Sequence, residues 1–465
     1  MTETNSPQRA VIDLTPANLD AQVRGLIDKG DMERLRRLLA DQHSPDVADV
    51  LERLTRPADR NATFRLLSPQ MAAEVIEEIS HYIARELVIA LPPDFAGPML
   101  RHMEIDDLVE ILGNELRDRQ EQSLAQLEPV LAQAIRAQLA YPTNSAGRLM
   151  TTRFVRTYPE MTAAETLAFI KSTDDDYETV TDIYVLDEGR LIGVASLRAV
   201  VRANSSTPIS ALMQTEPISV SPETKGEDAA RLLGRYDFMA LPVVSSEGRM
   251  LGIITVDDAI DVLTAAQTAD LLGIGGVHGE ENAAPYFTVP ILKVIRQRLI
   301  WLILLFVGGS ITSGVLEAFS VELGAVVALS FYIPLLIGTG GNTGSQTVSM
   351  IIRGMTTNDI KPADLFRVVR RELVSGVILG VLLGLIAFGR VLLQEGGADS
   401  LPLVVAASVI AVCAWSNVIA AVIPMFAKRF KIDPALISAP LISTTVDATG
   451  LLIYMLIAKA LLNAI

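Results

Sequence analysis

A single carboxylate, Asp447, lies inside an apolar run near the end of this 465-residue chain. The stretch SAPLISTTVDATGLL places it roughly 12 Å along a helix that begins at Ala439. A carboxylate at that depth in a membrane is costly and by default marks an ion or substrate path. Ser443 and Thr444 precede it by four and three residues, on the same helix face. The structural alternative is a protonated or serine-paired carboxyl. Oxygen ligands of this kind suit a hard, hydrated cation such as Mg²⁺ rather than Zn²⁺.

A second unusual stretch, GTGGNTGSQ at residues 338–346, brings four glycines and several polar side chains into an apolar run. Gly is unfavourable in a helix interior, and non-helical backbone at membrane depth is tolerated only where it is buried in protein or lines a watery cavity. We therefore predict that this span breaks here, one turn after Pro334, and exposes backbone carbonyls beside a pathway. For the glycines taken alone, a packing kink is the alternative. The residues predicted to line the pathway are Gly338, Gly340, Gly341, Asn342, Gln346, Ser443 and Thr444.

Five apolar segments are long enough to cross about 30 Å of hydrocarbon and so to position these residues. Basic residues such as Arg370 and Lys428 gather in the loops on one side, which predicts a cytoplasmic N-terminus and a C-terminus outside. The third segment carries Gly376, Gly380 and Gly384, a row that lets helices pack closely. The predicted spans lie near residues 299–319, 325–352, 373–393, 401–426 and 439–462.

The charge of the chain is divided unevenly between its two halves. Residues 1–289 carry 26 Lys+Arg against 45 Asp+Glu, whereas residues 290–465 carry 13 against 9. This pattern indicates an acidic soluble half followed by a membrane half. It argues against nucleic acid as a partner and suits multivalent cations, with plain solubility as the alternative. The single Cys413 rules out a disulfide framework and fits a reduced compartment, and MTETNSPQRA does not read as a cleavable signal peptide.

The soluble half contains two internal repeats. SPDVADVLERL, SPQMAAEVIEEI and PPDFAGPMLRHM recur every 24 residues, with Pro45, Pro69 and Pro93 at the predicted start of each helix. Repeated short helices of this kind stack into a superhelix with a shared core. Further on, LMTTRFVRTYPEMTAAETLAFI is echoed by LMQTEPISVSPETKGEDAARLL, and IYVLDEGRLIGVASLRAVV by LPVVSSEGRMLGIITVDDAI.

The second repeat resembles a pair of CBS domains, which commonly bind adenine nucleotides or other effectors. In nucleotide-binding members an Asp often follows the second pair of strands and holds ribose. Asp257 and Asp258 stand there in the second copy, and Ala199 stands there in the first. The resemblance therefore implies a nucleotide site beside Phe238, Asp257 and Asp258, and this departure counts against a second site.

Nearly the whole chain resembles the MgtE family of magnesium channels. The stretches that carry the resemblance are YPTNSAGRLMT, YDFMALPVV, TVDD, FYIPLLIGTGGNTGSQ and DPALISAPLISTTVDATGLLIY. The expected fold is a multidomain membrane protein with an α-helical superhelical N domain, an α/β CBS-domain pair and an all-α five-helix transmembrane domain. The expected domains are a disordered tail at 1–17, the N domain at 18–140, CBS domains at about 141–205 and 206–265, a connecting helix and linker at 256–292, and the transmembrane domain at 293–465.

The resemblance also implies a homodimer in a prokaryotic inner or plasma membrane, with the pore on the two-fold axis and hydrated Mg²⁺ held at Asp447. Cytoplasmic Mg²⁺ would bridge acidic residues of the soluble domains and close the pore, since a ligand that binds only the closed state shifts the population toward it. The implied regulatory ligands are Glu74, either Asp106 or Glu110, Glu227, Asp237, Asp258, Asp261 and Asp270.

Four positions depart from the family pattern. Lys225, Ala266 and Ala269 stand where acids are frequent, and Ala439 stands where an Asn often precedes the Pro. Fewer sensor carboxylates predict weaker or differently tuned gating by Mg²⁺.

The expected function is Mg²⁺ uptake through a channel that cytoplasmic Mg²⁺ closes. The alternatives are a divalent cation carrier or exchanger for Mg²⁺ or Co²⁺, a sensor that does not conduct, a chloride channel and an intramembrane metalloprotease. A protease of this kind needs a motif such as H-E-x-x-H, and the four histidines lie outside the predicted spans, so we expect no enzymatic activity. The residues leave selectivity among Mg²⁺, Co²⁺, Mn²⁺ and Ca²⁺ open.

Overall fold

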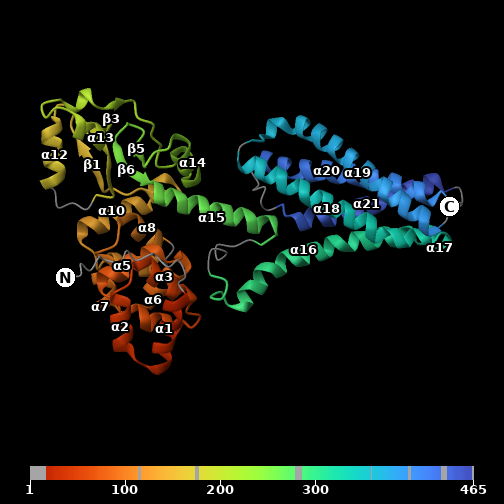
Figure 1. The fold of residues 1–465 in the computed structure, drawn as a ribbon, viewed down its shortest axis with the longest axis horizontal. Coiled ribbons are helices and arrows are strands. Elements are labelled where there is room, and N and C mark those ends of the chain that lie inside the picture. Colours follow the sequence, from red (N-terminus) through yellow and green to blue (C-terminus); the bar gives the residue numbers. More distant parts are fainter. Residues whose placement is uncertain are drawn as a thin grey trace, which may run out of the picture. The chain divides into compact units, whose positions relative to one another are not determined.

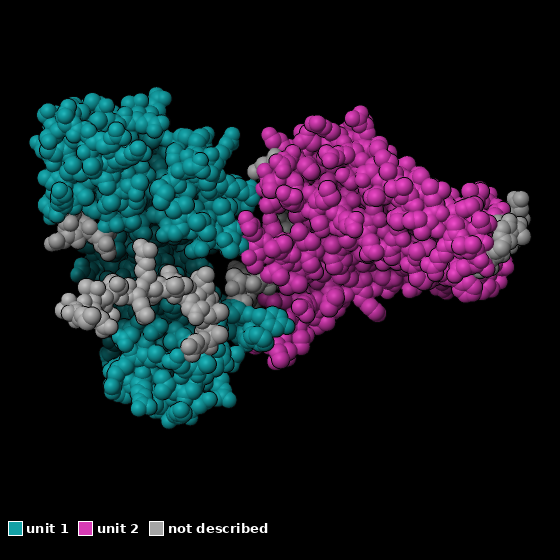
Figure 2. Space-filling model, in the orientation of Figure 1, with its two compact units in different colours: residues 1–266, 283–289 teal, residues 267–282, 290–465 magenta. Residues whose placement is uncertain are grey.

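The computed structural model describes residues 17–113, 117–172, 177–277, 285–357, 359–395, 400–430 and 437–462. The chain divides into two compact units, which Figure 2 distinguishes by colour. Unit 1 comprises residues 1–266 and 283–289, and unit 2 comprises residues 267–282 and 290–465. The tail expected over residues 1–17 lies outside the described residues, apart from Ala17.

Short helices form the first part of unit 1 (Figure 1). Pro45, Pro69 and Pro93 each stand in the first turn of a helix, as the 24-residue repeat predicts. At that position the missing N–H of proline costs nothing. The helices are α1 (Ala17–Lys29), α2 (Met32–Ala40), α3 (Ser44–Arg53), α4 (Pro57–Phe64), α5 (Pro69–Glu78), α6 (His81–Ala90), α7 (Pro93–Leu100), α8 (Ile105–Gly113), α9 (Arg117–Leu124) and α10 (Pro129–Leu139).

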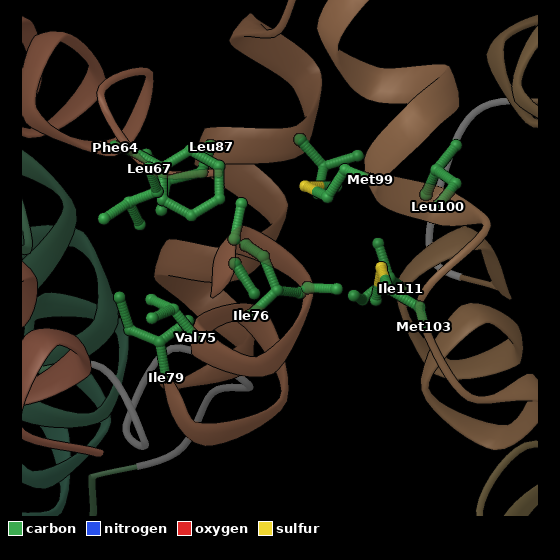
Figure 3. Packing of buried hydrophobic residues seen from close by; sticks show 14 of the residues in the cluster. Phe64, Leu67, Val75, Ile76, Ile79, Leu87, Met99, Leu100, Met103 and Ile111 are labelled. Atoms are coloured by element: carbon green, nitrogen blue, oxygen red, sulfur yellow. The ribbon is translucent and has the colours of Figure 1, made fainter. Parts of the chain in front are cut away.

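The apolar faces of these helices meet in one continuous core, part of which Figure 3 shows. Phe64 and Leu87 lie in it with Val75 and Ile76 of α5 and Met99 of α7. Each short helix buries its apolar stripe against its neighbours, because helices of this length are marginal on their own.

A buried arginine ties successive helices together. Arg60 of α4 is 1% exposed, and its guanidinium donates to the carbonyls of Leu51 and Leu54 at 3.1 and 2.6 Å and to Glu86 of α6 at 2.9 Å. These bonds provide donors for carbonyls at the end of α3, where the regular α-helical hydrogen-bond pattern stops. The same device recurs where Arg24 donates to the carbonyl of Arg53 and Arg65 to that of Ala90.

The second part of unit 1 has the duplicated α/β organisation that the sequence predicts. Strands β1, β2, β3 and β4 form one sheet in that order, with β1 parallel to β2 and the other pairs antiparallel, and β5 and β6 form an antiparallel pair. The elements are α11 (Ala146–Leu149), β1 (Phe154–Thr157), α12 (Ala163–Ser172), β2 (Thr179–Asp187), β3 (Arg190–Ser196), α13 (Leu197–Arg202), η1 (Ile209–Ala211), β4 (Gln214–Thr215), α14 (Gly226–Tyr236), β5 (Ala240–Val244) and β6 (Met250–Thr255).

The two E-G-R turns pair across the duplication. Gly189 and Gly248 have φ of +82° and +78°, a conformation that favours glycine. Leu191 N donates to the carbonyl of Gly248 at 3.0 Å, and Met250 N donates to that of Gly189 at 3.0 Å. This reciprocal pair of hydrogen bonds joins equivalent positions of the two copies, as expected for a duplicated module.

The helix α15 (Val256–Ile274) begins directly after β6, and its first part belongs to unit 1 and its last part to unit 2. In unit 2, α16, α19, α20 and α21 are long and apolar enough to cross a membrane, judged over the described residues. The helix α18 has 29 residues and carries the glycine-rich stretch. The helices are α16 (Ile291–Ala318), α17 (Ser320–Ala325), α18 (Ala328–Thr356), η3 (Pro362–Asp364), α19 (Leu365–Glu395), α20 (Leu401–Arg429) and α21 (Ala439–Leu461).

In unit 2, α20 packs against α18, α19 and α21, which run side by side with it (Figure 1). The glycine row of α19 faces α20, as predicted. A Cβ on Gly376 would lie 2.8 Å from Ala414 Cα, and one on Gly380 would lie 2.7 Å from Ile410 Cα. The two backbones therefore approach as closely as only glycine permits.

Candidate ion pathway and acidic cluster

Asp447 lies in the first half of α21, beside α18. The helix begins after Ser438, which accepts a hydrogen bond from Leu441 N at 3.4 Å. Asp447 Oδ1 is buried and has no hydrogen-bond partner among the described residues. A Cβ on Gly341 of α18 would lie 3.6 Å from this oxygen, so the absence of a side chain at Gly341 leaves room for the carboxylate.

The prediction of a broken second span is wrong. The helix α18 runs without interruption from Ala328 to Thr356, with Pro334 inside it. Its glycines serve close packing instead: a Cβ on Gly340 would lie 2.7 Å from Val412 and 2.8 Å from Val446, and one on Gly344 2.6 Å from Ser416 Oγ. Packing against two neighbouring helices compensates for the weak helix propensity of these glycines.

Backbone carbonyls of this stretch accept hydrogen bonds from side chains. Ser416 Oγ of α20 donates to the carbonyl of Gly340 at 2.6 Å, and Thr343 Oγ1 donates to that of Thr339 at 2.7 Å. The expected exposure of carbonyls to a pathway is therefore replaced, at Gly340, by a buried interhelical bond.

The predicted pathway residues divide into three groups. Gly340 and Gly341 are buried between helices, whereas Gly338, Asn342 and Gln346 recur every four residues along an exposed face of α18. On α21, Ser443 and Thr444 are half-buried, and a Cβ on Gly308 of α16 would lie 3.1 Å from the methyl group of Thr444. The three residues of the exposed face are named the polar stripe below.

Lys459, near the end of α21, has a carboxylate partner other than Asp447. Its Nζ lies 3.0 Å from Glu322 Oε1 of α17. In sequence it lies 12 residues, or roughly 18 Å of helix, beyond Asp447.

A cluster of carboxylates occurs in unit 1, where α5, α8, α15 and the start of β2 approach one another. Carboxylate oxygens of Glu104, Asp106 and Asp107 lie within 4.8 Å of one another, a spacing that allows them to hold a metal ion. Arg153 Nη1 lies 4.0 Å from Glu104 Oε1. Asp258 accepts a hydrogen bond from Thr255 Oγ1 at 2.7 Å. The name acidic cluster is used below for Glu77, Glu104, Asp106, Asp107, Glu178 and Asp258.

The members of the acidic cluster raise one another's pKa values. Burial, with the charges of Asp258 and Glu104, raises the pKa of Asp106 to about 8. Burial and the charges of Asp106 and Glu77 raise the pKa of Asp107 to about 9. Burial raises the pKa of Asp258 to about 6, against the hydrogen bond from Thr255. Because ionised carboxylates at this spacing repel one another, a divalent cation or protons would stabilise the cluster.

Two further carboxyls of the cluster, Glu77 and Glu178, behave in the same way. Burial and Glu104 raise the pKa of Glu77 to about 7, and burial with Glu104 raises that of Glu178. Glu178 Oε2 is buried without a hydrogen-bond partner among the described residues. The donor set consists of carboxylate oxygens, which fits Mg²⁺.

The structure brings together some of the regulatory residues implied by the sequence. Asp106 and Asp258 belong to the acidic cluster, Glu74 adds its charge to Glu77, and Asp261 adds its charge to the neighbouring Glu78. The others have different surroundings: Glu227 pairs with Arg231, Asp237 ends α14 with φ of +54°, His81 Nε2 lies 3.3 Å from Glu110, and Asp270 lies in unit 2.

Four members of the acidic cluster, Glu77, Glu104, Asp107 and Glu178, are absent from the sequence prediction. The run EIDD at residues 104–107 carries a local signal, because three of its four residues are acidic. Glu77 and Glu178 carry no comparable signal, since folding brings them to the cluster from α5 and from the start of β2.

The residues implied for a nucleotide lie at the second copy of the duplicated module. Phe238 stacks on Tyr236 with ring centroids 5.5 Å apart and an interplanar angle of 14°. Asp257 is exposed in the first turn of α15, and Asp258 is engaged with Thr255. A stacked aromatic surface and a nearby free carboxylate are groups that an adenine ring and a ribose could use.

Comparison with known proteins covers nearly the whole chain. Residues 333–457 match the MgtE family model, described as a divalent cation transporter, residues 42–144 match the MgtE intracellular N domain, and residues 146–206 and 209–265 match the CBS domain. The magnesium transporter MgtE of Thermus thermophilus is 36% identical over 452 residues, covering 96% of this chain and 99% of that one. Its namesake from Bacillus subtilis is 29% identical over 445 residues, covering 93% and 97%.

A solved structure resembles the soluble half. The cytosolic domain of the Mg²⁺ channel MgtE, crystallised in complex with ATP, shares 34% identity with a TM-score of 0.50 and covers 52% of this chain and 99% of that one. The short helices of the first part of the chain, the duplicated α/β module and the apolar helix bundle that carries Asp447 follow one another in this order, and each part matches a family model. This chain belongs to the MgtE family of divalent cation transporters.

Proposed function

We propose that this chain forms a Mg²⁺-selective channel for magnesium uptake, which closes when cytoplasmic Mg²⁺ binds to its acidic soluble domains. The observation that carries the proposal is Asp447, a carboxylate in an apolar helix whose buried Oδ1 has no hydrogen-bond partner among the described residues. Such an oxygen is costly to bury unless a cation or a proton satisfies it. The names of the relatives support Mg²⁺ as the cation.

The channel is proposed to be a homodimer with its pore on the two-fold axis. The polar stripe of Gly338, Asn342 and Gln346 supports this arrangement, since polar side chains on a spanning helix rarely face lipid. A second copy of α18 and α21 across the axis would supply a second Asp447. The two carboxylates would then hold one hydrated Mg²⁺, which keeps several of its waters.

The membrane is proposed to be the prokaryotic inner or plasma membrane, with the N-terminus in the cytoplasm and the C-terminus outside. The basic residues at the ends of the apolar helices support this orientation, for example Lys293 in the first turn of α16 and Arg429 at the end of α20.

The regulatory site is proposed to be the acidic cluster, together with Glu74, Asp261 and the other implied ligands of unit 1, Glu110, Glu227 and Asp237. Mg²⁺ bound there would neutralise carboxylates that repel one another and so favour the compact, closed arrangement of the soluble domains. The complex of the related cytosolic domain with ATP supports an adenine nucleotide beside Phe238 and Asp257 as a second effector.

Electrical recording tests the pore. Asp447→Ala is expected to abolish Mg²⁺ current, whereas Glu317→Ala, at an exposed carboxylate near the end of α16, is expected to leave it unchanged. Thermal unfolding of both variants shows whether they fold. Normal current through folded Asp447→Ala would refute the pore assignment. A flux that saturates and depends on a counter-ion would favour the second candidate, a Mg²⁺ or Co²⁺ carrier.

The gating proposal has its own test. The double variant Asp258→Ala with Asp261→Ala is expected to conduct normally but to need more cytoplasmic Mg²⁺ for closure. Glu247→Ala, which removes an exposed carboxylate beside Arg249, serves as the matched control. An unchanged Mg²⁺ response of the double variant would return both acids to an ordinary solvated surface.

A further inference from the structure

A second carboxylate, Glu372, lies in a spanning helix of unit 2, and neither the sequence prediction nor the proposed function uses it. It stands one turn before Gly376 in α19, in register with the glycine row that faces α20. A Cβ on Gly376 would lie 2.8 Å from the carbonyl oxygen of Cys413, and Asn417 follows Cys413 by one turn of α20. Glu372 and Asn417 therefore continue the contact between the two helices by one further turn.

Asn417 is almost completely buried, with 1% of its surface exposed. Its Nδ2 donates to the main-chain carbonyl of Glu372 at 3.3 Å and to Glu372 Oε2 at 3.4 Å. Its Oδ1 is buried and has no hydrogen-bond partner among the described residues. The amide thus presents an unsatisfied acceptor beside a carboxyl group.

The charged groups around Glu372 can be named helix by helix. On its own helix, Arg371 is the neighbouring charge that acts on it. On α20, the charged residues are Lys428 and Arg429 in the last turn, where Lys428 Nζ donates to the carbonyl of Met355 at 2.7 Å. On η3, Asp364 accepts a hydrogen bond from Lys361 N at 3.0 Å.

The protonation state of Glu372 decides whether the amide is satisfied. An ionised carboxylate has only acceptors, so Asn417 Oδ1 would stay unsatisfied and would face negative charge. A protonated carboxyl has one donor and one acceptor, and it can form a closed pair of hydrogen bonds with a primary amide. No metal ion is needed for this pair of hydrogen bonds.

We propose that Glu372 and Asn417 form a proton-binding site that fastens α19 to α20. A proton taken from water binds Glu372 Oε1 and is donated to Asn417 Oδ1, while Asn417 Nδ2 donates to Glu372 Oε2. Loss of the proton returns it to water and opens the pair. Because α20 also packs against α18 and α21, the protonation state of Glu372 is linked to the packing of α18, the helix whose Gly341 lies beside Asp447. The site is independent of the proposed function.

Tryptophan fluorescence tests the proposal in the full-length protein in detergent. The two tryptophans of the chain, Trp301 and Trp415, lie in α16 and α20, so their signal reports on unit 2. The thermal midpoint is measured between about pH 4 and about pH 9, which brackets the titration of carboxyl groups in proteins. Glu372→Gln is the main variant, because an amide pair keeps both hydrogen bonds at every pH. Glu317→Gln, at an exposed position of α16, is the matched control.

The wild-type midpoint is expected to fall relative to that of Glu372→Gln by about 2–4 °C as the pH rises, the shift expected for the loss of one hydrogen bond in a domain of this size. The sign follows from linkage, because the folded state binds the proton more tightly than the unfolded state does. Glu317→Gln is expected to parallel the wild type. Titration of the soluble half affects all variants alike and cancels in the difference.

Three results would overturn the proposal. Parallel pH profiles of the wild type and Glu372→Gln would show that Glu372 does not titrate in this range. Failure of Glu372→Gln to fold would show that the ionised carboxylate is required. A wild-type midpoint that responds to Na⁺ or Mg²⁺ at constant pH, where Glu372→Gln does not respond, would assign the site to a metal ion.

Discussion

Replacement of single glycines in the spanning helices by alanine distinguishes a continuous, tightly packed α18 from a broken one. A Cβ on Gly340 would lie 2.7 Å from Val412 Cγ1 and 2.8 Å from Val446 Cγ1. Both valines are β-branched and have one strongly preferred rotamer in a helix, so they cannot turn aside. Gly338, two residues earlier, is exposed and has open space around its Cβ position among the described residues.

The expected magnitudes follow from these distances. Alanine is favoured over glycine in a helix interior by about 1 kcal/mol, so Gly338→Ala is expected to stabilise the protein by about 0.5–1 kcal/mol. Overpacking of a close contact costs about 1–3 kcal/mol, so Gly340→Ala is expected to destabilise by up to about 2 kcal/mol after this gain. Gly376→Ala is expected to cost more, because its Cβ would meet the backbone of α20 at Ala414.

The assay is thermal unfolding followed by the fluorescence of Trp301 and Trp415, with a shift of about 2–4 °C for each kcal/mol. The expected order of midpoints is Gly338→Ala, wild type, Gly340→Ala and Gly376→Ala, from highest to lowest. In a broken span the glycines would adopt backbone conformations that alanine disfavours. A midpoint of Gly338→Ala below that of the wild type would therefore refute the reasoning, as would equal midpoints for Gly338→Ala and Gly340→Ala.

Three further predictions concern other parts of the chain. Arg60→Leu leaves buried carbonyls and a carboxylate without their donor and is expected to cost about 3–5 kcal/mol, whereas Arg85→Leu, at an exposed position of α6, should be nearly neutral; circular dichroism of thermal unfolding measures both. The pKa of Asp107 is raised to about 9, so the folded state holds a proton that the unfolded state releases near pH 4. With chelator present, the free energy of unfolding should therefore fall as the pH rises from about 4 to about 9. Asp107→Asn should remove this part of the pH dependence. Glu322→Gln removes an ion pair with the exposed Lys459 and should leave the unfolding midpoint in the fluorescence assay nearly unchanged; a clear drop in the midpoint would contradict the weak role given to this pair.

Local chemistry made much of the fold predictable. Proline marks the starts of α3, α5 and α7 because its fixed φ and missing N–H suit the first turn and little else in a helix. The repeated E-G-R turns marked the duplication, and Gly189 and Gly248 adopt the positive φ that such turns require. The glycine row of α19 could be recognised as a packing face because its spacing of four places all three residues on one side of a helix.

The same chemistry misled the prediction for α18. Glycine at Gly340 has two opposite uses, to release the backbone from helical geometry or to let two helices approach. The sequence around it does not distinguish these uses, because the deciding neighbours, Val412 and Val446, lie far away along the chain. The assignment of Asp447 to the ion pathway therefore stays a prediction, whereas the predicted backbone geometry of α18 is wrong.

The candidate regulatory site shows a similar limit. Asp106 and Asp258 could be named from family resemblance, but Glu77 and Glu178 could not, since their pKa values are raised only after burial and the approach of Glu104. Glu372 escaped notice for a further reason. It falls just before the apolar segment predicted over 373–393, whereas α19 begins at Leu365 and so includes it.

The sequence by itself indicated which segments are apolar enough to cross a membrane, where the soluble repeats begin and that a carboxylate lies inside an apolar helix. These features depend on hydrophobicity, proline and short-range periodicity, which act within a few turns of the chain. Only the tertiary structure decided that α18 stays helical, that the acidic cluster assembles from four segments and that Asn417 meets Glu372. Each of these depends on side chains that folding brings together from distant positions in the chain. Burial and mutual repulsion there give the side chains properties, such as raised pKa values, that they do not have in water.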